Sequence, residues 1–392
     1  MKTQIIYLAL IAATLWGFSC SKSSKVSSHD NNDTESTTME TADSDTINNS
    51  ESSESLSSET DETNETDDGI ARFDTDPTSD CVHPMVTEKC INGWCEIPAG
   101  CFIFGAPQDQ PCRAANSDTQ VQVTLTRSFV IQQYEVTQKQ WKDAEFPNPT
   151  TTGPYTDYVD DDKPVTYVNW YEAMAYANAL SKKEGLAECY NLSNCTGTVG
   201  SGCQDQREFC YIKQWNEVYN CEDDPHVYDD WYACPGYRLP TAVEWEYAAR
   251  AGTMTATYNG NFQVFVMPDE YKVEPTLEPI AWYKSEEGED QLYKVGLKRA
   301  NNWGLFDVLG NADEWIDYIE TGWNLATNEG TEGPLVDPVG TKEETDLRRC
   351  RNGGNPSMMG CWIATAHSTE YFASDRTMNG GFRLVRTLPS DK

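Results

Sequence analysis

The stretch GYRLPTAVEWEYAAR, residues 236–250, decides the fold of this chain. Thr241 is followed three residues later by Glu244, which is the pattern of a capping box, so we expect a helix to begin directly after Thr241 and to fill the rest of the stretch. Gly252 is expected to end this helix, because glycine readily adopts the left-handed conformation found at helix ends. Arg238 and Glu244 can form a buried ion pair that locks the turn before the helix.

The sequence on either side of this stretch predicts short elements separated by many turns. A second helix is expected over residues 170–182, where Asn169 can act as the N-cap and apolar residues recur at helical spacing. Strands are expected over residues 97–105, 121–125 and 129–131. Strands and helices do not alternate regularly, so a doubly wound parallel sheet has no support. We therefore predict an irregular, loop-rich α+β domain with few helices and short strands, stapled by disulfides.

The N-terminal fifth of the chain has the composition of an export signal and a tether. Residues 1–20 combine a basic start with an apolar run that is shorter than the roughly 20 residues a membrane span needs, which is typical of a cleaved signal. Cys20 follows a small residue and is the predicted lipid anchor to a membrane, with an ordinary secretory signal as the alternative. Residues 21–80 are rich in Ser, Thr, Asp and Glu and predict a disordered acidic tether. The folded domain is expected over residues 81–392.

Charge and cysteine content narrow the class of protein further. The formal net charge of -34 argues against a nucleic-acid partner, because binding to phosphates requires basic patches. The 14 cysteines indicate an oxidising compartment and predict disulfides, with residues 188–235 forming a cysteine-rich, stapled insertion. A zinc site is disfavoured by the absence of paired CxxC motifs. The sequence thus predicts an exported protein, in the bacterial cell envelope or secreted.

Five stretches, in order along the chain, resemble the formylglycine-generating enzyme family, also called sulfatase-modifying factors. They are YEVT at 134–137, PV and VNW within 164–170, GYRLPTAVEWEYAAR at 236–250, NWGLFDVLGNADEW at 302–315, and GFR at 381–383. The resemblance covers roughly residues 96–386. It implies an irregular C-type-lectin-like fold and, as the family's activity, oxidation of a cysteine in a protein substrate to formylglycine.

The resemblance also implies a structural calcium ion in the turn of the NWGLFDVLGNADEW stretch. Leu309, Gly310 and Ala312 can offer carbonyl oxygens there and Glu314 a carboxylate, and calcium takes such mixed oxygen ligands. A second calcium site of the family would need an asparagine before Trp282, where this chain has EPIAW.

The family's oxidase chemistry uses copper(I) held by two cysteines, because a soft metal ion prefers thiolates. The corresponding segment here is RNGGNPSMMGC, residues 351–361, and counting from Asn355 places Met358 and Ile363 at the two copper positions. Cys361 and Cys350 remain as candidate catalytic thiols. The simpler interpretation is that these two cysteines form a disulfide with each other.

Two hypotheses follow from the resemblance and the altered loop. One is a protein-modifying oxidoreductase, which would require copper(I). The other is a non-catalytic, surface-anchored module that binds an extended peptide or a glycan, with Trp170, Trp282 and Trp303 as candidate groove aromatics and Asn355 as a further candidate substrate-binding residue. Four scattered histidines do not favour the iron-dependent branch of the superfamily, and no Gly-x-Ser-x-Gly elbow supports a hydrolase.

Overall fold

The computed structural model describes most of the chain after residue 80, and all of these residues belong to one compact unit. The described residues are 81, 84, 88–107, 110–111, 113, 120–203, 209–210, 219–222, 224–263, 272–286, 291–319, 334–339 and 348–389. The predicted signal, the anchor Cys20 and the tether lie outside them. Among the described helices, none has the length and apolar character needed to cross a membrane.

Three α-helices and four short 3-10 helices are present in the described residues. The α-helices are α1 (Gln138–Asp143), α2 (Trp170–Lys183) and α3 (Ala242–Arg250), and the 3-10 helices are η1 (Pro149–Thr152), η2 (Thr156–Tyr158), η3 (Trp231–Ala233) and η4 (Gly360–Trp362). The predicted N-caps Asn169 and Thr241 are confirmed, and each forms a full capping box. Helix α1 was not expected, because it is too short to show a helical period in the sequence.

Helix α3 ends at Arg250 as predicted, but its left-handed cap is the residue before the expected Gly252. Ala251, with φ of 44°, is the left-handed cap, and its N–H donates to the carbonyl of Tyr247. Gly252 follows with φ of 93°. The chain therefore turns through two left-handed residues, and the glycine supplies the second of them.

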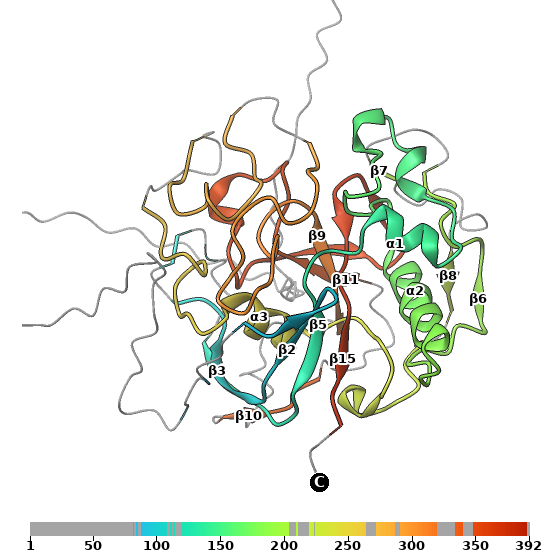
Figure 1. The fold of residues 1–392 in the computed structure, drawn as a ribbon, viewed down its shortest axis with the longest axis horizontal. Coiled ribbons are helices and arrows are strands. Elements are labelled where there is room, and N and C mark those ends of the chain that lie inside the picture. Colours follow the sequence, from blue (N-terminus) through green and yellow to red (C-terminus); the bar gives the residue numbers. More distant parts are fainter. Residues whose placement is uncertain are drawn as a thin grey trace, which may run out of the picture. The chain divides into compact units, whose positions relative to one another are not determined.

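The strands are short and form several small sheets (Figure 1). They are β1 (Cys90–Ile91), β2 (Trp94–Ile97), β3 (Gly100–Phe104), β4 (Val121–Leu125), β5 (Phe129–Gln132), β6 (Cys195–Thr196), β7 (Phe209–Cys210), β8 (Asn220–Cys221), β9 (Asp313–Ile319), β10 (Leu335–Val336), β11 (Arg348–Asn352), β12 (Ser368–Phe372), β13 (Arg376–Thr377), β14 (Gly380–Gly381) and β15 (Val385–Thr387). The larger sheets have the orders β1-β2-β5-β15, β10-β4-β3 and β12-β11-β9-β14. This mixture confirms the predicted irregular α+β class.

The strand expected over residues 97–105 is in fact two strands. Strand β2 ends at Ile97 and pairs with β5, whereas β3 begins at Gly100 and pairs with β4 in a different sheet. Pro98 lies between them and has no N–H to donate, so a continuous ladder cannot pass through it. The hydrophobic pattern located both strands but could not show that the chain changes sheets.

Helix α3 packs against β3 and β9 and brings Trp245 and Tyr247 into the core. The predicted pair of Arg238 and Glu244 is confirmed, since Nη1 and Nη2 of Arg238 lie 2.6 and 2.7 Å from the two carboxylate oxygens and both side chains are 1% exposed. This arginine also donates to the carbonyl of Leu239. The pair therefore fixes both the helix start and the turn that precedes it.

Disulfides join several of the short segments, as the cysteine content predicted. The bonds between described residues include Cys81–Cys101, Cys90–Cys95, Cys189–Cys234 and Cys195–Cys221. The Cys189–Cys234 bond closes the predicted insertion 188–235 near its two ends, and Cys195–Cys221 lies within it. No cysteine of the described residues is a free thiol.

Candidate functional site

Strand β9 carries Glu314, one of the predicted calcium ligands, near its start, and this side chain is buried. Both carboxylate oxygens of Glu314 accept hydrogen bonds from Arg383: Nε lies 2.8 Å from each oxygen and Nη2 lies 2.7 Å from Oε1. Trp245 of α3 donates from Nε1 to Oε2 at 2.7 Å. The carboxylate is thus neutralised by a guanidinium and held by an indole.

Two further buried carboxylates lie near this pair. Glu135 accepts from the backbone N–H of Ala312 and from the side chain of Asn311, at 2.8 and 2.9 Å. Burial, with the nearby charges of Asp307 and Glu314, raises the pKa of Glu135 well above its usual value. Burial likewise raises the pKa of Asp307 to about 6. One guanidinium, that of Arg383, therefore faces three buried acidic groups.

These contacts test the calcium site that the resemblance implies at Leu309, Gly310, Ala312 and Glu314. Calcium takes six to eight oxygen ligands, and a carboxylate offers about four lone-pair sites. Three N–H groups, Nε and Nη2 of Arg383 and Nε1 of Trp245, already point at the two oxygens of Glu314 and leave it about one free site for a metal ion. The calcium site stays a prediction.

The two positions that correspond to the family's copper ligands lie close together in space. A Cβ added at Gly354 would meet the Cδ1 atom of Ile363 at 2.4 Å and the sulfur of Met358 at 3.5 Å, so both side chains converge on this glycine. Ile363 is fully buried in the core cluster, and Met358 packs against the same cluster. The two positions found by counting from Asn355 are therefore neighbours in space, but their side chains are the alkyl group of Ile363 and the thioether of Met358, not thiols.

The candidate thiols Cys350 and Cys361 are both disulfide-bonded. Cys350 lies on β11 with no exposed surface, and Cys361 lies in η4 with 5% exposed. Their predicted bond to each other stays a prediction. Because copper(I) is bound by thiolates and disulfide sulfur carries no such charge, neither residue is available as a ligand in this state, and the donor set does not fit copper.

Asn355 is 4% exposed and belongs to a buried polar network. Its Oδ1 accepts from the backbone N–H of Ser357 at 2.9 Å and from the side chain of Asn379 at 3.2 Å. Nearby, Arg351 donates from Nη1 to Asp313 and to Thr377. Sequence reasoning missed Arg351 and Asn379, because neither has a partner near it along the chain.

The Arg351 guanidinium shows how tightly this network is packed. It lies 3.4 Å from the ring centroid of Tyr371 and 4.6 Å from that of Trp315. Its Nε and Nη2 atoms are buried and have no hydrogen-bond partner within the described part of the chain. Buried donors of this kind are normally satisfied, so ordered water is expected here.

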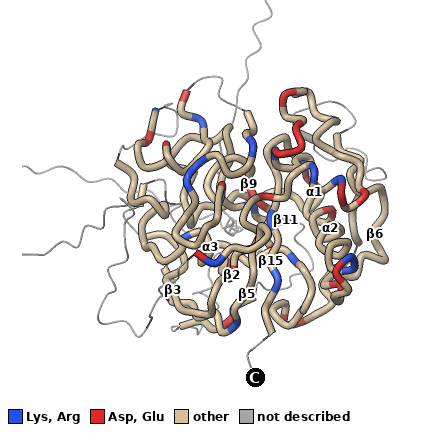
Figure 2. Tube along the Cα trace, in the orientation of Figure 1, with Lys and Arg blue, Asp and Glu red and all other residues tan. Residues whose placement is uncertain are grey.

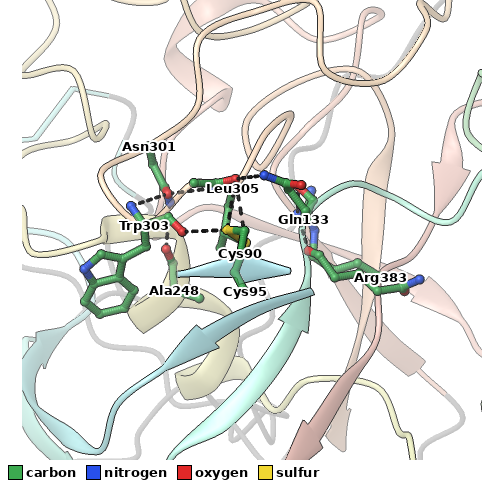
Figure 3. The surroundings of a disulfide bond; sticks show 10 residues. Cys90, Cys95, Gln133, Ala248, Asn301, Trp303, Leu305 and Arg383 are labelled. Atoms are coloured by element: carbon green, nitrogen blue, oxygen red, sulfur yellow. Dashed lines mark hydrogen bonds between the residues drawn. A yellow bond between two sulfur atoms is a disulfide. The ribbon is translucent and has the colours of Figure 1, made fainter. Parts of the chain in front are cut away.

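Two of the three predicted groove tryptophans, Trp170 and Trp303, are core residues, whereas Trp282 is half-buried and stacks on Tyr293. Trp170 has no exposed surface and donates from Nε1 to the carbonyl of Ile316. Trp303 is 2% exposed and packs edge-on against Tyr247. Figure 3 shows Trp303 beside the Cys90–Cys95 disulfide, where the Sγ of Cys90 lies 3.4 Å from its carbonyl oxygen. Neither tryptophan is positioned to contact a ligand at the surface.

The insertion is fastened to the core by His226, whose side chain is 3% exposed. Nδ1 lies 2.5 Å from Asp224 within the insertion, and Nε2 lies 2.8 Å from Asp317 on β9. The imidazole stacks on Trp231 with ring centroids 4.2 Å apart. Tyr190 donates to the second oxygen of Asp317. Nothing in the sequence indicated this cluster, because Asp317 and Tyr190 lie far from its other members along the chain.

Open surface grooves lie on either side of helix α2. One has a volume of about 510 Å³ and the other about 550 Å³, and both are bordered by Ala179 and Lys182. The second includes Trp94, Tyr176 and Leu180 as apolar lining. Figure 2 shows acidic and basic positions side by side at the end of α2. The described surface thus offers apolar lining next to charged residues beside this helix.

Comparison with known proteins identifies the family. The profile described as "Sulfatase-modifying factor enzyme 1-like domain" matches residues 84–388. The chain belongs to this family. The match spans nearly all of the described residues, and it includes every one of the five stretches that carry the resemblance.

The curated relatives of the chain include proteins named as an enzyme, as an inactive homologue of that enzyme and as a chaperone. "Chaperone protein LppX" of Paenibacillus barcinonensis is 35% identical over 49% of this chain and 62% of that protein. A "Formylglycine-generating enzyme" of Thermomonospora curvata is 30% identical over 34% of this chain and 42% of that protein. An "Inactive C-alpha-formylglycine-generating enzyme 2" of Bos taurus is 32% identical over 30% and 35%. The chain thus spans less than two thirds of the length of these relatives.

Solved structures show the same fold. Treponema denticola variable protein 1 superposes with a TM-score of 0.54 at 24% identity, covering 75% of this chain and 95% of that one. PvdO from Pseudomonas aeruginosa gives 0.51 at 20% identity, covering 78% and 100%. At such identities the likeness concerns the fold alone.

The His226 cluster predicts a specific dependence of stability on pH. Burial acts to lower the pKa of His226, but the charges of Asp317 and Asp224 outweigh it and raise the pKa from 6.5 to about 9. Between pH 6.5 and pH 9, His226 therefore carries a proton in the folded protein that it lacks in the unfolded chain. The stabilisation from this protonated imidazole is complete below pH 6.5 and is lost as the pH rises through about 9. The slope attributable to His226 is about -1.4 kcal/mol per pH unit, or about 3 kcal/mol in all.

Denaturant unfolding of the wild type and of His226→Gln between pH 6 and pH 10 measures this slope. We expect the free energy of unfolding to fall more steeply with pH in the wild type, because glutamine does not titrate. Groups common to both proteins cancel in the difference. Parallel pH profiles would show that the imidazole is not held as a cation.

Proposed function

We propose that this chain is a non-catalytic member of its family that binds extended peptide segments of other proteins. One observation carries the proposal: the copper positions hold Met358 and Ile363, and the nearest cysteines, Cys350 and Cys361, are oxidised. Without a pair of thiolates, copper(I) has no ligands of the type it prefers. The chain keeps the fold, but apolar side chains that pack in the core stand where the family's enzymes have the two copper-binding cysteines.

The relatives support a binding role in place of catalysis. One curated relative is named a chaperone protein and another an inactive homologue of the enzyme. Both names belong to those proteins. They are nevertheless consistent with a family in which the domain persists after the oxidase chemistry is lost.

The grooves beside α2 are where we expect such a segment to bind. Leu180 and Trp94 provide apolar surface there, and Lys182 and Lys183 are exposed at the same helix end. An extended peptide buries alternate side chains against such a lining while its backbone stays solvated. A glycan is the alternative ligand. Of the tryptophans predicted for it, Trp170 and Trp303 are buried, and Trp282 does not border either groove.

We further propose that the protein is exported and held at a membrane by acylation of Cys20. The disulfides of the described domain form in an oxidising compartment, which supports export. Such an anchor with a flexible linker would present the domain at the surface of the cell envelope. The mass of the mature N-terminus tests this: a diacylated cysteine is expected, and cleavage elsewhere would refute it.

The enzymatic alternative has a direct test. The protein is reduced, loaded with copper(I), and incubated with a Cys-x-Pro-x-Arg peptide and oxygen, and the peptide mass is then followed. We expect no conversion of the cysteine to an aldehyde. The control is a copper-dependent formylglycine-generating enzyme treated in the same way. Aldehyde formation by this chain would overturn the proposal.

Binding is tested with a permanently unfolded protein, such as reduced and carboxymethylated α-lactalbumin, labelled for fluorescence anisotropy. Leu180→Glu places a charge on the apolar groove lining and is expected to weaken binding about tenfold or more. Leu297→Glu is the matched control, because Leu297 is 61% exposed and does not border either groove. Equal affinity of the two variants would locate the site elsewhere, and no affinity of the wild type would refute peptide binding.

A further inference from the structure

The groove of about 510 Å³ beside α2 has sides from two different parts of the chain. Helix α2 lines one side, and the insertion lines the other with Glu188 and residues 190–193. We call residues 188–193 the insertion wall and this groove the insertion-side groove. Among the described residues of the insertion, none borders the other groove, of about 550 Å³. The insertion therefore contributes to one of the two grooves and not to the other.

The insertion wall is held against α2 by Asn178, whose side chain is buried. Its Nδ2 donates to the carbonyl of Tyr190 at 2.7 Å, and its Oδ1 accepts from the backbone N–H of Tyr190 at 3.2 Å. One side-chain amide thus bonds both backbone groups of a single wall residue, which is what a paired strand would otherwise do. The width of the groove at this point is set by these two bonds.

A second segment of the insertion, residues 225–227, runs alongside the wall. The N–H of Asn191 donates to the carbonyl of Pro225 at 2.6 Å, and the N–H of Val227 donates to the carbonyl of Cys189 at 3.2 Å. His226 lies between these two bonds, opposite Tyr190 in antiparallel register. The position of the wall therefore depends on where His226 is held.

One carboxylate, that of Asp317 on β9, holds both segments of the insertion. Tyr190 donates from its hydroxyl to Oδ2 at 2.9 Å, and Nε2 of His226 lies 2.8 Å from Oδ1. All three side chains are buried. Hydrogen bonds to an ionised acceptor are stronger than those between neutral groups, so Asp317 fixes the wall from the core. His226 itself borders neither groove.

We infer that the insertion is a partner-recognition element of the proposed binding site, and that His226 is the positioning residue of its wall. This role rests on the proposed function, because the ligand is an extended segment of another protein. The two grooves meet at α2, where Ala179 and Lys182 border both. A segment that crosses the helix there contacts apolar lining in one groove and the insertion wall in the other.

The lining of the two grooves indicates which segments match them. The wall offers the polar side chains of Asn191 and Ser193, together with the carboxylate of Glu188 across from the ammonium group of Lys182 on α2. The other groove offers apolar surface such as that of Leu180. Extended peptides are selected by the side chains that successive pockets accept. A segment with apolar side chains next to polar or charged ones therefore matches the pair of grooves.

Amide hydrogen exchange of the full chain at about pH 7 tests the positioning role of His226 without any ligand. In His226→Gln, the amides of Tyr190 and Asn191 are expected to exchange about tenfold faster or more. The reason is that glutamine cannot bond both carboxylates and stack on Trp231 as the imidazole does. Amides of α3 are expected to keep their wild-type rates, because α3 has no residue in the insertion.

His367→Gln is the matched control, since it changes another histidine that lies outside the insertion, with its ring 5.0 Å from that of Trp362. It is expected to leave the exchange of Tyr190 and Asn191 unchanged. Equal exchange of these two amides in both variants would overturn the positioning role. So would an acceleration spread evenly over the whole chain, because that would reflect a general loss of stability.

Binding of the labelled, carboxymethylated α-lactalbumin tests the wall as part of the site. Ser193→Trp places an indole in the insertion-side groove and is expected to weaken binding about tenfold or more, because the bulky ring occupies the space of the segment. Thr198→Trp is the matched control, an exposed position of the same insertion that borders neither groove. Equal affinities of these two variants would overturn the recognition role.

The two grooves give distinguishable results. If Leu180→Glu weakens binding and Ser193→Trp does not, the proposed function stands and the role of the insertion is overturned. If the wild type has no affinity for the unfolded protein, the proposed function is refuted together with the recognition role. The exchange rates of Tyr190 and Asn191 decide the positioning role of His226 in either case.

Discussion

The buried ion pair between Arg383 and Glu314 is the interaction on which the rest of the described structure depends. Glu314 is the second residue of β9, Arg383 belongs to the closing segment of the domain, and Trp245 of α3 bonds the carboxylate of Glu314. These three residues come from parts of the chain far apart in sequence. Breaking a buried ion pair costs folding free energy, because one charge is left unpaired in the interior. The position of each of the three segments therefore depends on the positions of the other two.

A loop-rich domain needs such pairs because its regular secondary structure provides hydrogen-bond partners for only part of the backbone N–H and C=O groups. Short strands and 3-10 turns leave many carbonyls without partners, and buried carbonyls must be bonded. The buried arginines meet this requirement by donating to loop carbonyls while pairing with carboxylates. Disulfides hold the loop segments together as well, through covalent bonds. The clearest example is Cys189–Cys234, which closes the insertion.

This design does not depend on the positions that correspond to the family's copper ligands. The framework depends on Arg238, Glu244, Glu314 and Arg383, none of which is a copper ligand. Met358 and Ile363, which stand at those positions, add to the apolar core beside this framework. The insertion held by His226 is an addition on the outside of the same framework, fastened to β9 at Asp317.

The sequence alone determined the elements that depend on neighbouring residues. The capping boxes at Asn169 and Thr241, the strand over residues 121–125 and the Arg238–Glu244 pair follow from side chains within a few positions of each other, and the structure confirms them. The family motifs and the absence of cysteine at the copper positions could likewise be found by counting along the chain.

Only the tertiary structure decided which distant residues meet. It placed Trp170 and Trp303 in the core instead of at a groove, and it paired the carboxylate of Glu314 with Arg383. It also joined His226 to Asp317, which are 91 positions apart. The physical reason is that burial and long-range pairing are set by how the segments pack together, and no local pattern records which partner a buried charge will find.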